Sequence, residues 1–219
     1  MPAFVPPRCS IVVKSISAGI VALEIAVDGR DALVLEVGLR EADPSAPSAA
    51  TPRVFLSYAH DDEEHADSVR AFAEFLTLCG VDVHMDRWAL DRRRDWHQWA
   101  IEQIKSADFV LVIASPVCRQ VGDGESGSAG HWGLQSELSV MRELLHSDRA
   151  TWLRKLLPVV LPHGSVDDIP LFLQPRIADH YLVQEFTVLG AEDLLRAIFG
   201  QPPYRRPPRA SGHLMLPLA

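Results

Sequence analysis

The feature that most constrains the fold is an alternation of short apolar runs with longer amphipathic segments. The run DFVLVIAS at 108–115 is the most continuous, and it predicts a central strand that is buried on both faces. Four further strands are predicted at 53–59, 81–86, 155–162 and 179–186, and helices at 61–79, 96–107, 130–145 and 191–199. The alternation predicts an α/β fold: a flavodoxin-like, five-stranded parallel sheet in the order 2-1-3-4-5, with helices on both faces.

The segments on either side of this core differ from it in composition. Residues 1–41 contain alternating β-branched runs around Asp28-Gly29, which predict a short β-rich segment made of a hairpin or three strands. Residues 42–52 are rich in Pro, Ser and Ala and predict a linker. Residues 200–219 are Pro-rich and predict an unstructured tail. We therefore expect one main domain at 53–199.

Composition and motifs exclude several classes of function. A net charge of −8 leaves no broad cationic surface, so no nucleic-acid partner is predicted. No apolar run reaches the roughly 18 residues needed to span a bilayer. With no secretory signal pattern and three widely spaced cysteines, the sequence predicts a cytoplasmic protein without a membrane contact. The nine histidines form no recognised zinc spacing, so no metal site is expected, and redox use of NAD is not expected either.

Polar residues follow the first three predicted strands. Parallel sheets of this order bind ligands beyond the carboxyl ends of the strands, where strands 1 and 3 part. The candidate binding residues placed there are Ser57, Tyr58, His60, Asp86, Arg87, Trp88 and Ser115. A purely structural interpretation stays open for several of them, since Asp86 can end a strand and cap a turn, and Trp88 can anchor its loop.

One acidic residue of the helix at 130–145 stands out on a helical wheel. The predicted buried stripe consists of Leu134, Leu138, Met141 and Leu145. Glu143 falls on the opposite side, whereas Glu137 falls about 60° from the centre of the stripe. A carboxylate at the margin of an apolar face is a candidate for restricted solvation and a perturbed pKa. The alternative is that Glu137 is an ordinary surface residue.

Three segments together resemble a known family. The segments VFLSYAHDDEEH, GVDVHMDRWAL and SADFVLVIASPVC occur in order and at sensible spacing. They are similar to the SEFIR domain, a relative of the TIR domain, and the resemblance covers about residues 53–199. Two positions depart from the family pattern. The sequence DRRRD stands where SEFIR domains often have Pro-Gly, and Trp132 precedes Glu137 by five residues rather than the four common in TIR enzymes.

The resemblance implies a reaction and a catalytic residue. Many TIR-like domains cleave NAD⁺ between nicotinamide and ribose with one glutamate on the corresponding helix, which here is Glu137. NAD⁺ is then the substrate, and no cofactor is expected. The carboxylate would stabilise the positive charge that develops on the ribose. Trp132 or Trp88 would stack on nicotinamide, and Arg87 or Arg92 would assist main-chain amides at the pyrophosphate.

Two functions remain open at this point. The first is an NAD⁺ glycohydrolase of SEFIR/TIR type, which the resemblance associates with an assembly-activated, anti-phage immune effector in bacteria. The second is a homotypic signalling adaptor that binds itself or other SEFIR/TIR domains without chemistry. For the second, Arg87 and the arginine cluster Arg92, Arg93 and Arg94 would face the acidic residues Asp61, Asp62, Glu63 and Glu64 of a neighbouring copy.

Overall fold

A computed structural model describes residues 9–17, 20–27, 30–38, 51–90, 92–125 and 130–204. The chain divides into two compact units, residues 1–50 and 51–219. The predicted turn at Asp28-Gly29, the predicted linker up to residue 50 and the predicted tail from residue 205 lie outside the described residues. The two units are therefore described separately.

The first unit contains a three-stranded antiparallel sheet. Its strands are β1 (Cys9–Ser17), β2 (Ile20–Val27) and β3 (Arg30–Gly38), in the order β1-β2-β3. The register aligns Leu23 of β2 with Val13 of β1 and with Leu35 of β3. Of the two arrangements that the sequence allows, three strands or a single hairpin, this unit has three strands.

The second unit is built on a five-stranded parallel sheet. Its strands are β4 (Arg53–Ser57), β5 (Asp82–His84), β6 (Phe109–Ile113), β7 (Leu156–Val160) and β8 (Tyr181–Leu182). They lie in the order β5-β4-β6-β7-β8, and all four neighbouring pairs are parallel. The predicted order 2-1-3-4-5 and the α/β class are confirmed.

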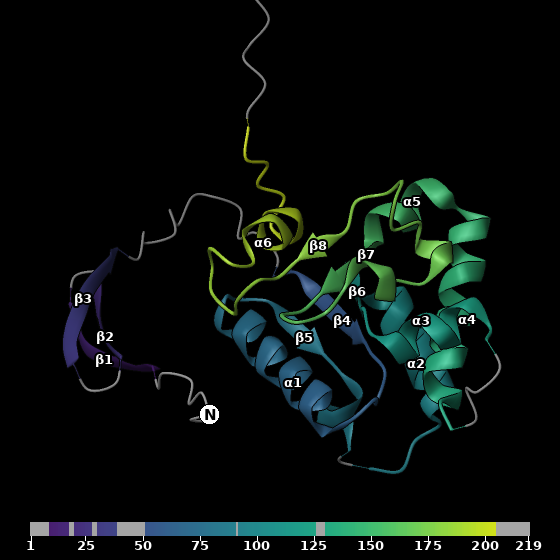
Figure 1. Ribbon diagram of the computed structural model, residues 1–219, viewed down its shortest axis with the longest axis horizontal. Helices are drawn as coiled ribbons and strands as arrows, with labels where there is room; N and C mark the ends of the chain where they lie inside the picture. Colours follow the sequence, from purple (N-terminus) through teal and green to yellow (C-terminus); the bar gives the residue numbers. More distant parts are fainter. Residues whose placement is uncertain are drawn as a thin grey trace, which may run out of the picture. The chain divides into compact units, whose positions relative to one another are not determined.

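Helices cover both faces of this sheet (Figure 1). They are α1 (Glu63–Leu78), α2 (Trp96–Ser106), α3 (Pro116–Asp123), α4 (Trp132–Ser147), α5 (Arg149–Lys155) and α6 (Glu192–Ile198). Short 3-10 turns occur at η1 (Asp86–Ala89), η2 (Val166–Asp168) and η3 (Leu171–Leu173). Because successive residues of a strand alternate between faces, the sheet separates two apolar cores. One core includes α1 and α6, and the other includes α2, α3 and α4.

Several predicted elements differ from those observed. The helix α3 was missed, because the Gly- and Ser-rich stretch that follows it suggested a continuous loop. Cys118 is buried inside α3. The strand predicted at 179–186 is shorter in the structure and covers Tyr181–Leu182, because these are the residues in register with β7. The short helix α5 was not predicted either.

The amino end of α1 also differs from the prediction. The sequence predicts a helix that begins at residue 61. The observed N-cap is Asp62, whose carboxylate accepts a hydrogen bond from the backbone N–H of His65 at 2.8 Å. Asp61 is therefore available for a tertiary contact, which is described below.

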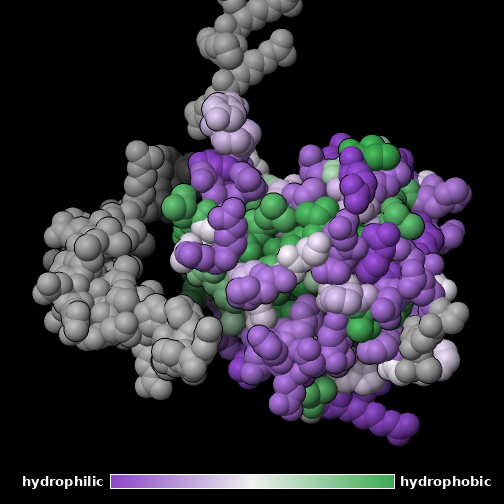
Figure 2. Space-filling view, in the orientation of Figure 1, coloured by the Kyte–Doolittle hydropathy of each residue, from purple (hydrophilic) through white to green (hydrophobic). Residues whose placement is uncertain are grey.

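The face of the second unit seen in Figure 2 is mostly hydrophilic and carries an apolar strip. Figure 2 shows this strip across the middle of the face, over β8 and α6. Leu182 of β8 and Val188 and Leu189 of the following loop are exposed apolar residues. No helix in the described part of the chain combines the length and the apolar character needed to cross a bilayer.

Candidate functional site

The centre of the candidate site is a hydrogen bond between α4 and the carboxyl end of β4. The hydroxyl of Ser57, the last residue of β4, donates to Oε2 of Glu137 at 2.6 Å. Ser57 is buried, and Glu137 is partly buried. The four leucine and methionine residues of the predicted stripe are buried in α4, and Glu143 is exposed. The distinction between the two glutamates that the helical wheel predicted is therefore confirmed.

The environment of Glu137 raises its pKa from 4.5 to about 7. Burial is the main cause, because it removes water from the charged form. The negative charge of Asp86 acts in the same direction, whereas the Ser57 hydroxyl and the charge of His60 lower the pKa. At neutral pH this carboxyl group is therefore poised between its protonated and ionised forms.

A second polar group beside Glu137 is organised around Asp86. The Tyr58 hydroxyl donates to Oδ1 of Asp86 at 2.7 Å, and Nε2 of His60 lies 2.9 Å from Oδ2. The backbone N–H of Arg87 also donates to Oδ1. Burial opposes the ionisation of Asp86, but the bonds from His60 and Tyr58 outweigh it and hold the pKa below its ordinary value. Asp86 is thus an ionised anchor for two aromatic rings.

The two partners of Asp86 respond in the same direction. The hydrogen bond to Asp86 raises the pKa of His60, so its ring is more easily protonated than a free imidazole. Burial, followed by the charge of Asp86, raises the pKa of Tyr58, so its phenol stays protonated. The rings of Tyr58 and His60 pack together with their centroids 5.0 Å apart.

The structure places Ser115 in a different cluster from Glu137. The Ser115 hydroxyl donates to Asp61 at 3.2 Å and accepts from the backbone N–H of Cys118, so it is the N-cap of α3. The other oxygen of Asp61 lies 3.5 Å from the backbone nitrogen of Val117. A cavity of about 310 Å³ borders this pair and extends to the loop after β7 at His163. The predicted binding residues at the sheet edge therefore fall into two groups.

The predicted aromatic platforms are exposed at the surface. Trp132 is 74% exposed at the start of α4, and Trp88 is 46% exposed in η1. Trp132 lies five positions before Glu137 on α4, so the two side chains point about 140° apart around the helix axis at 100° per residue. Stacking of nicotinamide on either ring stays a prediction.

The predicted interface residues differ in their exposure to solvent and in the contacts that they make within the chain. The guanidinium of Arg94 lies over the rings of Trp96 and Trp99, with its carbon 5.5 and 5.6 Å from their centroids. Arg92 and Arg93 are exposed, as are Glu63 and Glu64 in the first turn of α1. Asp62 caps α1, and Asp61 bonds to Ser115.

Two features of the site were missed by the sequence reasoning. His97 of α2 is hydrogen-bonded through Nδ1 to the hydroxyl of Ser136, the residue before Glu137. The Asp61–Ser115 bond joins residues 54 apart. A local sequence signal for the role of Ser115 was present, because Ser followed by Pro, here Ser115 and Pro116, is typical of the start of a helix. Within the described residues, no group of three or more His, Cys, Asp or Glu side chains is arranged to hold a metal ion.

Comparison with known proteins gives the family. Residues 52–191 match the SEFIR domain, which is more than half of the chain. The second unit, with its five-stranded parallel sheet and polar carboxyl edge, belongs to the SEFIR domain family.

Individual relatives agree with this assignment. Interleukin-17 receptor D of Mus musculus is 28% identical over an alignment of 165 residues, and the match covers 64% of this chain and 22% of the receptor. The same receptor of Homo sapiens is 25% identical over an alignment of 134 residues, and the match covers 54% of this chain and 18% of the receptor. The chain thus spans about a fifth of the length of these curated relatives. The crystal structure of a prokaryotic SEFIR domain superposes with a TM-score of 0.53 at 26% identity, covering 73% of this chain and all of that domain.

Proposed function

We propose that this chain is a SEFIR/TIR-like NAD⁺ glycohydrolase that cleaves the bond between nicotinamide and ribose. The observation that supports this proposal most directly is the partly buried Glu137 carboxyl, bonded to Ser57 at the carboxyl edge of the sheet. A carboxylate in a poorly solvated site interacts strongly with a nearby positive charge. Such a group suits a reaction in which neutral nicotinamide leaves and the ribose becomes cationic.

The raised pKa of Glu137 fits a cationic substrate. With a pKa of about 7, the Glu137 carboxyl carries on average only about half a negative charge at neutral pH before substrate binds. The nicotinamide ring of NAD⁺ is positively charged, so its arrival favours the ionised carboxylate. Catalysis then depends on the ionised Glu137 carboxylate, which the positive charge of the bound substrate stabilises. The water that attacks the ribose would lose its proton to the same carboxyl group.

The surrounding groups have supporting roles in this proposal. Asp86 holds Tyr58 and His60 beside Glu137 and adds negative charge near the developing cation. The exposed rings of Trp88 and Trp132 are candidates to stack on the substrate once a second copy encloses the site. Such an enclosure would make assembly the activating step, as expected of an immune effector.

The test is nicotinamide release from NAD⁺ by the purified full chain at high protein concentration. Removing one electrostatic stabiliser of a transition state costs roughly 100-fold or more in rate. We therefore expect Glu137→Gln to lower the rate of nicotinamide release at least about 100-fold. Glu143→Gln is the matched control, because Glu143 lies on the same helix but is exposed. Equal activity of the Glu137→Gln variant and the wild type would refute the assignment.

A second candidate function is homotypic association without chemistry. Two observations favour it: the curated relatives are receptors, and exposed arginines and exposed glutamates lie on separate elements. In this proposal Arg92 and Arg93 of one copy contact Glu63 and Glu64 of another, head to tail.

Charge reversal tests this contact directly. We expect the double variant Arg92→Glu, Arg93→Glu to shift the protein toward monomer in size-exclusion chromatography with light scattering. The control is Arg176→Glu, because Arg176 is exposed on another loop and pairs with Asp167. An unchanged mass distribution in the double variant would exclude this contact.

A further inference from the structure

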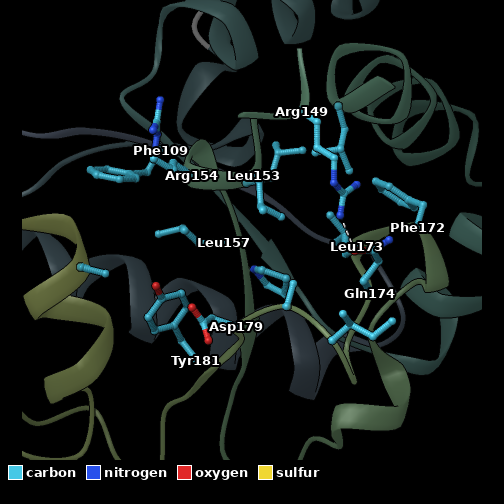
Figure 3. A pocket seen from close by; sticks show the side chains of 16 residues that line it. Phe109, Arg149, Leu153, Arg154, Leu157, Phe172, Leu173, Gln174, Asp179 and Tyr181 are labelled. Carbon is cyan, nitrogen blue, oxygen red and sulfur yellow. Dashed lines mark hydrogen bonds between the residues drawn. The ribbon is translucent and has the colours of Figure 1, made fainter. Parts of the chain in front are cut away.

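A second ligand-sized space lies at the opposite edge of the parallel sheet. A cavity of about 600 Å³ is lined by Phe109, Leu156 and Tyr181, the first residues of β6, β7 and β8 (Figure 3). Since the strands are parallel, this is the amino edge, whereas Ser57 and Glu137 lie at the carboxyl edge. A volume of 300–1,000 Å³ is typical of small-molecule sites.

Most of the lining of this cavity is apolar. Leu145 of α4, Leu157 of β7 and Phe172 and Leu173 of η3 contribute to its walls. Leu153 of α5 also lines it and is 41% exposed, so apolar surface continues to the mouth. A wall of this kind favours an apolar ligand through removal of its surface from water.

The polar groups of the cavity lie at separate positions. Figure 3 shows Arg149 beside Gln174 and Phe172, on the other side of the cavity from Asp179 and Tyr181. Arg149 donates through Nη2 to the side-chain oxygen of Gln174. A guanidinium has five N–H donors, and the Gln174 oxygen accepts from one of them.

The backbone at Gln174 is held in an uncommon conformation. Its φ of 56° lies in the left-handed region, which non-glycine residues rarely adopt. Its carbonyl accepts from the N–H groups of Ile177 and Ala178, which fixes the turn. Strain of this kind is often found at ligand clamps, and here it places the amide against Arg149.

Cationic side chains gather at this end of the second unit although the whole chain has a net charge of −8. A smaller cavity of about 240 Å³ shares Arg149 with the larger one and is also lined by Arg142 and His146. The guanidinium carbon of Arg142 lies 4.8 Å from the centroid of the Phe172 ring. Asp179 is the acidic residue in the lining of the large cavity. Arg154 also lines the large cavity and lies beside Phe109 in Figure 3, so cationic groups stand on both sides of the cavity, and Arg142 and Arg149 are those on the side away from Asp179.

We propose that this cavity binds a free, apolar monocarboxylate of the fatty-acid type. The carboxylate would accept two parallel hydrogen bonds from Arg149, because the planar guanidinium matches its geometry. The hydrocarbon chain would lie among Leu157, Phe172 and Leu173. This site is separate from Glu137 and does not depend on NAD⁺ cleavage.

The experiment is calorimetric titration of the full chain with decanoate, decanol and decyltrimethylammonium. We expect saturable binding of decanoate, weaker binding of decanol and no binding of the cation. Arg149→Gln should weaken decanoate binding at least about tenfold, because it removes a charged hydrogen bond. Arg70→Gln is the control, since Arg70 pairs with Asp67 and Glu74 on α1. Equal affinity for decanoate and decanol, or an unaffected Arg149→Gln variant, would overturn the proposal.

A second variant tests the cavity itself. Ala178 lines the cavity and is partly buried, so Ala178→Phe would fill part of the space without removing charge. We expect it to weaken decanoate and decanol binding alike. Unchanged decanoate binding in this variant would place the ligand elsewhere and refute the site.

Discussion

Two serine–carboxylate pairs lie at the carboxyl edge of the same sheet, and they differ in what else the carboxylate contacts. Ser57 at the end of β4 donates to Glu137, and Ser115 just after β6 donates to Asp61. Asp61 also lies near the backbone nitrogen of Val117, at the amino end of α3. The helix end supplies a positive electrostatic potential there. Glu137 has Ser57 as its hydrogen-bond donor, and the charge of Asp86 opposes its ionisation.

This difference separates a structural pair from a candidate catalytic one. The Asp61–Ser115 pair joins the residues before α1 to the start of α3, beside a helix end. Around Glu137, burial and the charge of Asp86 outweigh the hydrogen bond from Ser57, so the pKa of Glu137 rises to about 7. The two pairs therefore differ in the groups that surround the carboxylate.

The largest expected effect is on the pH dependence of NAD⁺ cleavage. The value of kcat/KM reports the ionisation of the free enzyme, and the active form of Glu137 is the carboxylate. We expect kcat/KM to be constant above pH 8 and to fall with a midpoint of about 7, losing about 100-fold by pH 5. Initial rates across this range measure it. A flat profile would show that Glu137 does not have to be ionised.

A smaller effect is expected from removing the serine of each pair. Ser57→Ala removes a donor that favours the charged form of Glu137, so its pKa rises. A rise of about one unit would lower kcat/KM at pH 7 about fivefold and leave it unchanged at pH 9. Ser115→Ala should leave the midpoint at about 7. A uniform loss at every pH in Ser57→Ala would contradict the idea that this hydroxyl acts on the ionisation of Glu137.

A different kind of effect is expected on stability, where the two pairs should respond with opposite signs. The pKa of Glu137 is higher in the folded chain than its ordinary 4.5, so the folded state binds a proton more tightly between pH 4.5 and 7. The free energy of unfolding therefore falls as the pH rises through that window. At pH 8, Glu137→Gln should raise it by about 2 kcal/mol, because the amide needs no charge in the buried site.

The matched change in the other pair is Asp61→Asn. It should lower the free energy of unfolding by about 1 kcal/mol at pH 8, because a neutral side chain interacts more weakly with the amino end of α3. Urea titrations at pH 5 and pH 8 measure both variants. Destabilisation of the same size in both variants at pH 8 would remove the distinction between the pairs.

Much of the fold was predictable because it follows from periodicity. The apolar run that became β6 and the alternation around it determined the sheet order, since parallel strands need crossover helices. The four buried residues of α4 determined its orientation, and this separated Glu137 from Glu143. Local patterns of this kind need no knowledge of distant contacts.

The remaining features depend on tertiary contacts or on competing local signals. Asp61 and Asp62 are both possible caps of α1, and the choice between them depends on Ser115, 54 residues from Asp61. The strand predicted at 179–186 contains an apolar run at Tyr181, Leu182 and Val183, but its pairing with β7 ends after Leu182. The position of Asp86 between Tyr58 and His60 required the sheet to bring β4 next to β5.

The hydrogen bond between Ser57 and Glu137 also determines the stage of folding at which the proposed NAD⁺-cleaving site can form. It joins residues 80 positions apart, from the first strand of the sheet to the fourth helix. Contacts of such long sequence separation form after local structure, because a large loop must close first. A chain still being synthesised therefore has no assembled site until α4 has emerged and packed. The proposed NAD⁺-cleaving centre is confined to the finished fold.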